Sequence, residues 1–219
     1  MTSKLASLCV GALAAGLLCG PAAAQPPRPD WESAGPLNAD PVQRMVSAIV
    51  RSGDNDGRPF MVVDKLGATV AVFDPGGELI GDAAALLGAA KGDDSAPWIG
   101  ERELSDIRPE ERTTPAGRFE AGLGPNLAGR EVLWIDYDAA VSLHPVINTA
   151  PKERRLQRLA SGTPADNRIS YGCINVGPGF FRNIVRPAFA GGGVVYILPE
   201  ARSARAVFPG LIRGPRRRG

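Results

Sequence analysis

The sequence predicts a mainly β fold with a few short helices, arranged as a sandwich or a partly open barrel. Short runs of β-branched and aromatic residues recur along the chain, and turns rich in glycine or proline separate them. Few segments place apolar residues at helical spacing. The 219 residues suit one domain, which is long enough to bury a core without disulfides or metals.

A short amphipathic helix is expected at the start of the globular part, within residues 40–57. Asp40 is a typical N-cap, and Pro41 suits the first helical position. Gly53 can end the helix in a left-handed conformation. The apolar residues of this segment recur every three or four positions and form one face: Val42, Met45, Val46, Ile49 and Val50. We expect this face to pack on the domain that follows.

The strands are expected to begin with a hairpin formed by residues 60–63 and 68–73. A third strand is expected at 78–81, after the turn residues Pro75-Gly76-Gly77. Residues 82–113 follow no clear period. The remaining expected elements are strands at 118–121, 132–143 and 193–198, helices at 152–159 and 180–189, and a polar loop at 160–167.

Residues 1–24 have the pattern of a secretory signal peptide, and residues 25–39 have that of a proline-rich linker. Lys4 precedes an apolar stretch, and Ala22-Ala23-Ala24 supplies a cleavage site with small side chains. The apolar stretch is short for a membrane span, which favours a cleaved signal over an uncleaved anchor. The chain is therefore expected to be exported to the periplasm or cell envelope.

The charge of the chain is distributed unevenly. Residues 201–219 form an Arg-rich tail with six arginines and no acidic residue, whereas residues 25–200 carry 18 basic and 23 acidic side chains. A mildly acidic globular part gives no indication of nucleic-acid binding. Membrane contact is expected only through the signal segment or the Arg-rich tail, and the simplest interpretation of the tail is a solvated end.

Export would leave one cysteine in the mature chain, Cys173, because Cys9 and Cys19 lie in the predicted signal. A lone cysteine in an exported protein is an intermolecular link, a reactive thiol or a small buried residue. The preceding Gly172 allows a substrate to approach the backbone closely, or permits an unusual dihedral angle. Consecutive backbone N–H groups around Cys173 suit an oxyanion hole, which needs fixed donors where negative charge develops.

His144 is the only histidine of the chain and lies near the end of a predicted strand. A thiol with a pKa of about 8.5 is only slightly ionised at neutral pH, and an adjacent imidazole can accept its proton. Together, Cys173 and His144 predict a cysteine nucleophile with a histidine base. The alternative is a histidine with a structural role.

Other chemistries find little support in the sequence. A zinc site usually takes three or four His, Cys or carboxylate ligands, and CxxC, HExxH, Walker A and GxSxG patterns do not occur in the chain. No metal and no cofactor is therefore expected. Acidic residues are plentiful, but no spacing singles out a catalytic pair.

The segment around Cys173 resembles the signature of the L,D-transpeptidase catalytic domain (YkuD type), which is S/T-H-G-C-x-N/R with an upstream histidine. The matching residues are Ser170, Gly172, Cys173 and Asn175, with His144 upstream. Three further stretches are similar to the family: Thr114 to Phe119, Met61 to Leu79 and Gly193 to Leu198. The resemblance implies an L,D-transpeptidase-like domain of mixed strands in residues 58–200.

Two features depart from the family pattern. Tyr171 stands where the family usually has a second histidine, which implies different hydrogen bonding around the nucleophile. The gap between His144 and Cys173 is also longer than is common, and residues 150–168 fill it with several basic side chains. This segment is either an insertion that meets the carboxylates of a peptide or a solvated basic helix.

The resemblance implies an enzyme of cell wall biogenesis and cell shape that acts on peptidoglycan stem peptides. Cys173 would attack the carbonyl before the terminal D-Ala of a tetrapeptide, form a thioester and pass the acyl group to an amine. His144 would act as base, oriented by a backbone carbonyl, and the N–H groups of Gly172 and Cys173 would bind the oxyanion. Supporting roles are expected for Ser170, Tyr171 and Asn175 around the Cys loop, and substrate contacts for Arg168 and Tyr137.

Two alternatives stay open at this point. One is an L,D-carboxypeptidase or amidase on the same scaffold, with water as acceptor. The other is a non-catalytic cell-wall-binding protein, which the replacement by Tyr171 suggests. For Tyr137, core packing is the alternative to a substrate contact. A thiol-redox role is disfavoured because no resolving cysteine remains after export.

Overall fold

The computed structural model describes residues 40–147 and 150–211. The predicted signal peptide (1–24), the linker (25–39) and the last part of the Arg-rich tail (212–219) lie outside the described residues. Of the helices in the described ranges, none combines the length and the apolar character that a membrane span requires.

The described residues form one mixed sheet of nine strands in the order β2-β1-β9-β4-β5-β6-β8-β3-β7. A further pairing of β2 with β3 closes eight of the strands into a ring, and β7 is attached to β3. The pairs β1–β9, β6–β8 and β3–β7 are parallel, and the others are antiparallel. The predicted fold class, mainly β with mixed strands, is confirmed. The strands are β1 Phe60–Asp64, β2 Thr69–Phe73, β3 Leu79–Gly88, β4 Gly117–Pro125, β5 Glu131–Asp136, β6 Val141–Pro145, β7 Arg168–Ser170, β8 Ile174–Val176 and β9 Gly193–Ile197.

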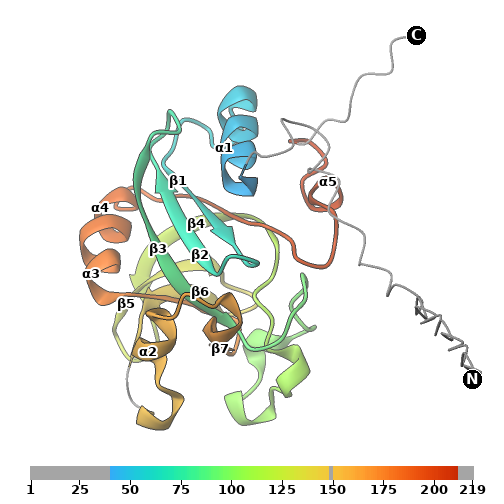
Figure 1. The fold of residues 1–219 in the computed structure, drawn as a ribbon, viewed down its shortest axis with the longest axis vertical. Helices are drawn as coiled ribbons and strands as arrows, with labels where there is room; N and C mark the ends of the chain where they lie inside the picture. The colour runs from blue at the N-terminus through green and yellow to red at the C-terminus, as the bar shows by residue number, and fades with distance from the viewer. Residues whose placement is uncertain (1–39, 148–149, 212–219) are drawn as a thin grey trace, which may run out of the picture.

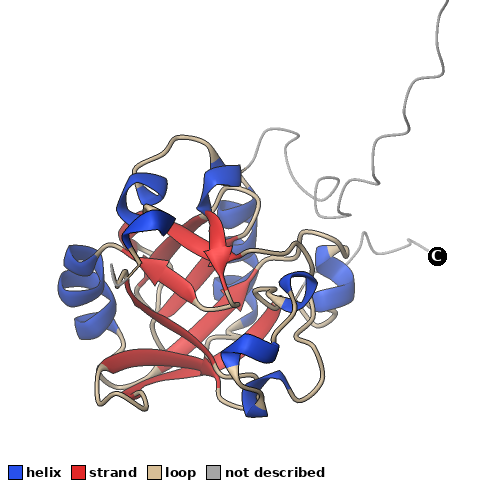
Figure 2. Ribbon diagram, turned by 90° about the horizontal axis from the view of Figure 1, so that it is seen from below, coloured by secondary structure: helices blue, strands red, loops and turns tan. Residues whose placement is uncertain are grey.

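The helices of the described residues are short and lie around the strands (Figure 2). The expected helix at 180–189 is a continuous helical stretch from Pro178 to Ala188, with a π-helical turn in its middle. The α-helices are α1 Pro41–Ser52, α2 Arg155–Leu159, α3 Pro178–Phe180, α4 Arg186–Ala188 and α5 Ala204–Val207, and η7 Phe181–Val185 is the π-helix. The 3₁₀ turns are η2 Ile99–Glu101, η3 Leu104–Asp106, η4 Pro109–Glu111, η5 Pro151–Glu153 and η6 Pro164–Asn167.

Helix α1 forms for the local reasons that its sequence indicates. The Asp40 side chain accepts a hydrogen bond from the Val42 N–H (3.0 Å) at the N-terminus. Gly53 adopts a φ of 71° at the other end, and its N–H donates to the carbonyls of Ile49 and Val50. The predicted apolar face is buried except for Val50, which is 41% exposed. Figure 1 shows α1 beside β1.

Two hydrophobic clusters lie on opposite faces of β1. Met61 and Val63 belong to the core inside the ring, whereas Phe60 and Val62 belong to a second cluster with the apolar face of α1. Side chains of a strand alternate between the two faces, so a strand buried on both sides has a continuous apolar sequence. Helix α1 therefore completes the outer core of the sheet.

Two strand predictions are wrong. The single strand expected at 132–143 is a hairpin, because residues 137–140 form a turn between β5 and β6. This turn contains no glycine or proline; Ala140 takes a φ of 53°, and the Asp136 carboxylate accepts the N–H of Ala139. Strand β3 continues to Gly88 instead of ending at 81, because its alanine-rich second half pairs with β2, β7 and β8.

Candidate active site

The lone thiol and the lone imidazole of the described residues lie on neighbouring parallel strands. Strands β6 and β8 pair with His144 opposite Asn175, and Cys173 immediately precedes β8. Because side chains alternate along a strand, Ser142 and Cys173 fall on the same face as His144 and Asn175. The sulfur of Cys173 lies 3.8 Å from the Ser142 Oγ and 3.6 Å from the Ala140 carbonyl oxygen. Cys173 is partly exposed.

The electrostatics of the pair lower the pKa of the thiol and raise the pKa of the imidazole. Burial raises the pKa of the Cys173 thiol, but the hydrogen bond and charge of His144, with donors of Ser142, outweigh burial and lower it. Burial lowers the pKa of His144, but Cys173 and the Pro145 carbonyl outweigh burial and raise it. Each group therefore stabilises the charged form of the other, as a nucleophile and its base require.

Both ring nitrogens of His144 have a polar neighbour. Nδ1 lies 2.9 Å from the carbonyl oxygen of Pro145, so a backbone carbonyl orients the ring as the family resemblance implies. Nε2 lies 3.0 Å from the Asn175 side-chain nitrogen. Asn175 was expected to brace the Cys loop; its amide contacts the histidine instead, and Asn175 is completely buried.

Ser170 and Thr114 hold the Cys loop. The Ser170 Oγ donates to the Cys173 carbonyl (2.5 Å) and accepts from the Gly172 N–H (3.1 Å). The Thr114 Oγ1 donates to the Gly172 carbonyl (2.8 Å) and accepts from the Gly88 N–H (2.9 Å). Gly172 has a φ of 130°, and a Cβ there would lie 2.8 Å from the Thr113 carbonyl oxygen, so only glycine fits.

The backbone N–H groups near Gly172 and Cys173 are the expected oxyanion donors, and the Gly172 N–H is engaged within the loop. That N–H already donates to Ser170 inside the loop, so it does not point freely toward a substrate. Of the two donors that the sequence suggested, the N–H of Cys173 remains as the candidate.

Tyr171 points to Arg112 rather than to the nucleophile. The Arg112 guanidinium lies 4.0 Å from the centre of the Tyr171 ring, in a cation–π arrangement. Arg112 is itself held by the Ile107 carbonyl (3.1 Å). The residue that replaces the family's second histidine therefore packs against a neighbouring loop.

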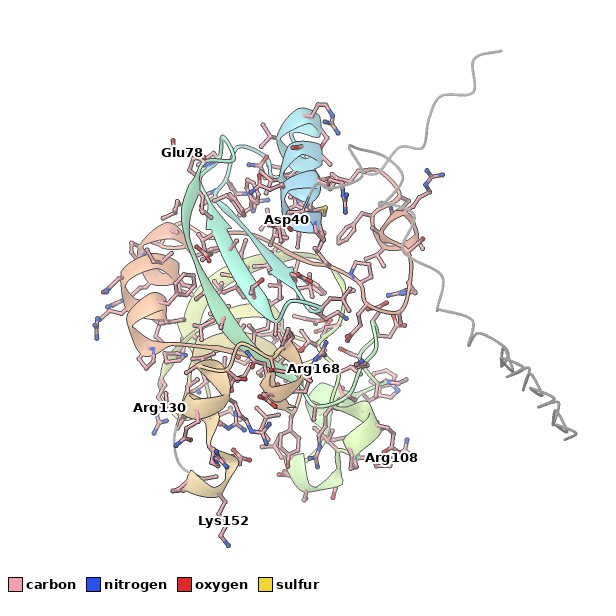
Figure 3. All side chains as sticks on the ribbon, in the orientation of Figure 1. Asp40, Glu78, Arg108, Arg130, Lys152 and Arg168 are labelled. Atoms are coloured by element: carbon pink, nitrogen blue, oxygen red, sulfur yellow. The ribbon has the colours of Figure 1, made fainter. Side chains whose placement is uncertain are left out.

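The assignment of Arg168 as a substrate contact is not supported. Its guanidinium donates to the Glu200 carboxylate (2.5 Å) and to the Lys65 carbonyl (2.8 Å), and its side chain is 11% exposed. Figure 3 shows Arg168 within the body of the fold, whereas Lys152 of the same basic segment projects outward. Arg168 is a structural residue because its donors are taken by groups of the fold.

Tyr137 lies in the turn between β5 and β6 and not on the strand of His144. It is 77% exposed and packs on the Trp134 ring at a centroid distance of 5.1 Å, so core packing is wrong as well. Tyr137 lines an open cavity of about 700 Å³, together with Trp98, Glu101 and residues 136–139. Ala139 lines the same cavity and is followed by Ala140, whose carbonyl contacts the sulfur. Neither Cys173 nor His144 is among the residues that line this cavity.

Three further residues of the site carry no role in the sequence-based prediction. Ser142 contacts the sulfur, Thr114 supports Gly172, and Arg155 of α2 donates to the Asn175 Oδ1 (2.6 Å). Thr114 lies in a stretch that resembles the family, but its contact with the Cys loop spans 58 residues. Within residues 40–147 and 150–211, no group of three or more His, Cys, Asp or Glu side chains is placed to hold a metal ion.

No protein-family model matches the chain, and the curated proteins contain no match. Solved structures are similar in part. An L,D-transpeptidase from Mycobacterium smegmatis aligns with a TM-score of 0.38 and 16% identity over 64% of this chain and 58% of its own. The catalytic domain of the E. faecium L,D-transpeptidase aligns with a TM-score of 0.36 and 19% identity over 65% of this chain and 98% of its own.

The helical cell shape determining protein Pgp2 from Campylobacter jejuni aligns with a TM-score of 0.40 and 14% identity over 73% of this chain and 56% of its own. The chain thus spans little more than half of the length of the Mycobacterium smegmatis protein and of Pgp2. All these TM-scores lie below 0.5, so the geometry of Cys173 and His144 remains the basis for a functional argument. The similar solved structures are mostly L,D-transpeptidase catalytic domains, the family that the Cys173 segment resembles.

Proposed function

We propose that this protein is an exported cysteine acyltransferase of the L,D-transpeptidase type, which acts on peptidoglycan stem peptides in the periplasm or cell envelope. The observation that carries the proposal is the pairing of Cys173 with His144. The thiol is partly exposed, and the imidazole lowers its pKa. The motif of Ser170, Gly172, Cys173 and Asn175 supports the choice of substrate class.

Acylation begins when the proton of Cys173 passes to His144. The thiolate attacks the carbonyl carbon before the terminal D-Ala and forms a carbon–sulfur bond, while the carbonyl oxygen takes the negative charge. The N–H of Cys173 is the candidate donor to this oxygen. His144 then returns its proton to the leaving amine, the carbon–nitrogen bond breaks, and free D-Ala departs from a thioester.

Deacylation repeats these steps with an acceptor. An amine of a second stem peptide loses a proton to His144 and attacks the thioester carbonyl, which forms an amide and releases the Cys173 thiolate. That thiolate takes the proton back from the imidazole. Water in place of the amine gives a carboxypeptidase, so the acceptor alone separates the two activities.

The test measures D-Ala release from a purified tetrapeptide muropeptide. We expect Cys173→Ala and His144→Ala to lose release by at least about a thousandfold, because each removes one member of a unit that acts together. Circular dichroism and thermal unfolding check that both variants retain the fold. Full release by folded Cys173→Ala would end the proposal.

Product masses distinguish the acceptors. With a stem-peptide amine present, a transferase gives a cross-linked product, whereas a carboxypeptidase gives only the shortened peptide. A thiol that forms no acyl adduct with any muropeptide would support the non-catalytic, wall-binding alternative.

A further inference from the structure

We propose that Arg155 is a positioning residue that acts through Asn175 to hold His144 in the tautomer with its proton on Nδ1. The inference rests on the proposed function for the role of His144 as base. It concerns a residue of the basic segment 150–168 between β6 and β7, for which two interpretations are open from the sequence. The structure favours a third interpretation, in which one arginine of this segment contacts a buried residue of the active site.

The contact between Arg155 and Asn175 connects α2 to the buried side of the site. The Arg155 Nη1 donates to the Asn175 Oδ1 at 2.6 Å, and Asn175 is completely buried. The Arg155 side chain is 15% exposed and also contacts the Glu153 carboxylate at 2.5 Å. A guanidinium fixed at both ends in this way has little freedom to release the amide.

The contact with Arg155 fixes the orientation of the Asn175 amide. Arginine has only donors, so the amide of Asn175 must present its oxygen to Arg155. Its NH₂ group then faces the His144 Nε2 at 3.0 Å. In the neutral, resting imidazole a proton on Nε2 would set two donors against each other, so the amide pairs with an Nε2 that carries a lone pair. This contact is given up when Nε2 accepts the Cys173 proton. The ring proton is thereby placed on Nδ1, which donates to the Pro145 carbonyl at 2.9 Å.

The positive charge of Arg155 also favours a neutral His144, as the contact with Asn175 does. The charged groups that face His144 are Cys173 before β8 and Arg155 from α2, and Glu153 faces Arg155. Cys173 raises the pKa of His144 against the effect of burial, whereas the Arg155 cation lowers it. A fixed positive charge favours loss of a proton at both steps in the titration of a coupled thiol and imidazole. Removal of Arg155 therefore shifts the whole titration to higher pH.

The neighbouring Arg158 offers a matched control. It lies on the same helix, but its guanidinium donates to the carbonyls of Glu153 (2.9 Å) and Asp166 (2.8 Å). A substitution of Arg158 removes the same charge and the same side-chain length from α2 without touching Asn175. Any effect that the two variants share is an effect on the helix.

The first test uses the fact that the chain has one histidine. In the ¹⁵N-labelled full chain, produced without added histidines, the imidazole nitrogens give one set of NMR signals. We expect the Nδ1–H tautomer in the wild type and in Arg158→Met, and a mixture of tautomers in Arg155→Met. A wild type with the proton on Nε2 would overturn the proposal.

The second test measures the rate at which iodoacetamide alkylates Cys173 as a function of pH, with Cys173 identified by peptide mass spectrometry. We expect Arg155→Met to react about threefold to tenfold more slowly on the acid side of the profile, because the profile moves to higher pH. Arg155→Lys keeps the charge and restores most of the rate, and Arg158→Met matches the wild type. An unchanged profile in folded Arg155→Met contradicts the proposal.

A further variant covers the case in which Arg155→Met does not fold. Asn175→Asp replaces the donor end of the amide by an acceptor, so we expect the histidine proton to move to Nε2; no movement contradicts the proposal. Both readouts use the resting protein without substrate. Tautomer and alkylation shifts without D-Ala release would refute the proposed function alone, and D-Ala release without these shifts would refute the role of Arg155 alone.

Discussion

Two groups of ionisable side chains, one mostly buried and one partly exposed, lie on either side of Thr114. One is the Cys173–His144 pair between β6 and β8. The other, here called the Lys65 cluster, consists of Lys65, Asp93, Arg168 and Glu200. The Thr114 carbonyl accepts from the Lys65 Nζ (3.0 Å), and its Oγ1 donates to the Gly172 carbonyl. The two groups are therefore neighbours that share one residue.

The two groups differ in how many close hydrogen-bond partners their polar atoms have. The Lys65 Nζ has three oxygen partners within 3.0 Å, from Gly92, Asp93 and Thr114. The Asp93 carboxylate accepts three backbone N–H groups, those of residues 200 to 202. The oxygen neighbours of the Cys173 sulfur lie farther away, at 3.6 and 3.8 Å, and the residue is partly exposed.

This difference explains why strong burial of charge is a poor sign of catalysis by itself. A charge whose partners are complete stabilises a fold, whereas a nucleophile needs free coordination and an open side. The Lys65 cluster should therefore govern stability, and the Cys173 pair should govern reactivity. Four measurements test this division.

The largest effect is expected for Lys65→Met. Loss of the ammonium leaves Asp93 without its buried counter-ion, which costs about 3–5 kcal/mol of the free energy of unfolding. Urea unfolding measures this cost, with the exposed Lys91→Met as control, expected within about 0.5 kcal/mol of the wild type. A Lys65→Met protein that is as stable as the wild type would remove the structural role of the cluster.

His144→Gln should show the opposite behaviour. Without the imidazole, only the donors of Ser142 oppose the effect of burial on Cys173 and its pKa rises, so we expect alkylation at pH 7 to slow by about tenfold to a hundredfold. The free energy of unfolding should change by about 1 kcal/mol or less. Equal reactivity of the two proteins would show that His144 does not activate the thiol.

The substitution Thr114→Val should affect both groups. It leaves the Gly88 N–H and the Gly172 carbonyl without a partner, so we expect a loss of about 1–3 kcal/mol in stability together with slower alkylation of Cys173. Thr163→Val, at an exposed position, is the control. A change in stability with no change in reactivity would separate Thr114 from the site.

The smallest effect is expected for the loss of stability at low pH. Burial raises the pKa of Asp93, but Lys65 and the N–H groups of Glu200 and Arg202 outweigh it and lower it. A lowered folded-state pKa gives stability that is complete above the ordinary pKa of about 3.9 and is lost as the pH falls toward the folded value. Between pH 7 and pH 3 the wild type should thus lose more stability than Asp93→Asn. Equal losses would contradict the assignment.

Local patterns made parts of the molecule predictable. Helix α1 and strand β9 follow from capping residues, helical spacing and a run of β-branched residues. The turn at 137–140 was missed because Asp138 and Ala140 fill it without glycine or proline. In β3, three successive alanines have weak strand preference, and pairing with β2 and β8 decides their conformation.

The candidate site was predictable to the same extent. Cys173 and His144 stand out because each is unique in its context. The contacts of Arg155 with Asn175 and of Thr114 with Gly172 join residues 20 and 58 positions apart. No local pattern encodes such contacts, because the closed ring of strands creates them. The same holds for Arg168, whose partners Lys65 and Glu200 are 103 and 32 positions away.

The pairing of β6 with β8 has a consequence for how the protein can change. Only three residues of β8 pair with β6, and they fix which side chains stand next to one another. A slip by one residue would turn Cys173 away from His144 while the ring of strands kept its number of members. A deletion or insertion of one residue in β6 should therefore abolish the reactivity of the thiol and leave a folded barrel. A deletion or insertion of two residues would return the His144 side chain to the face of Cys173 but would pair it with a different residue of β8.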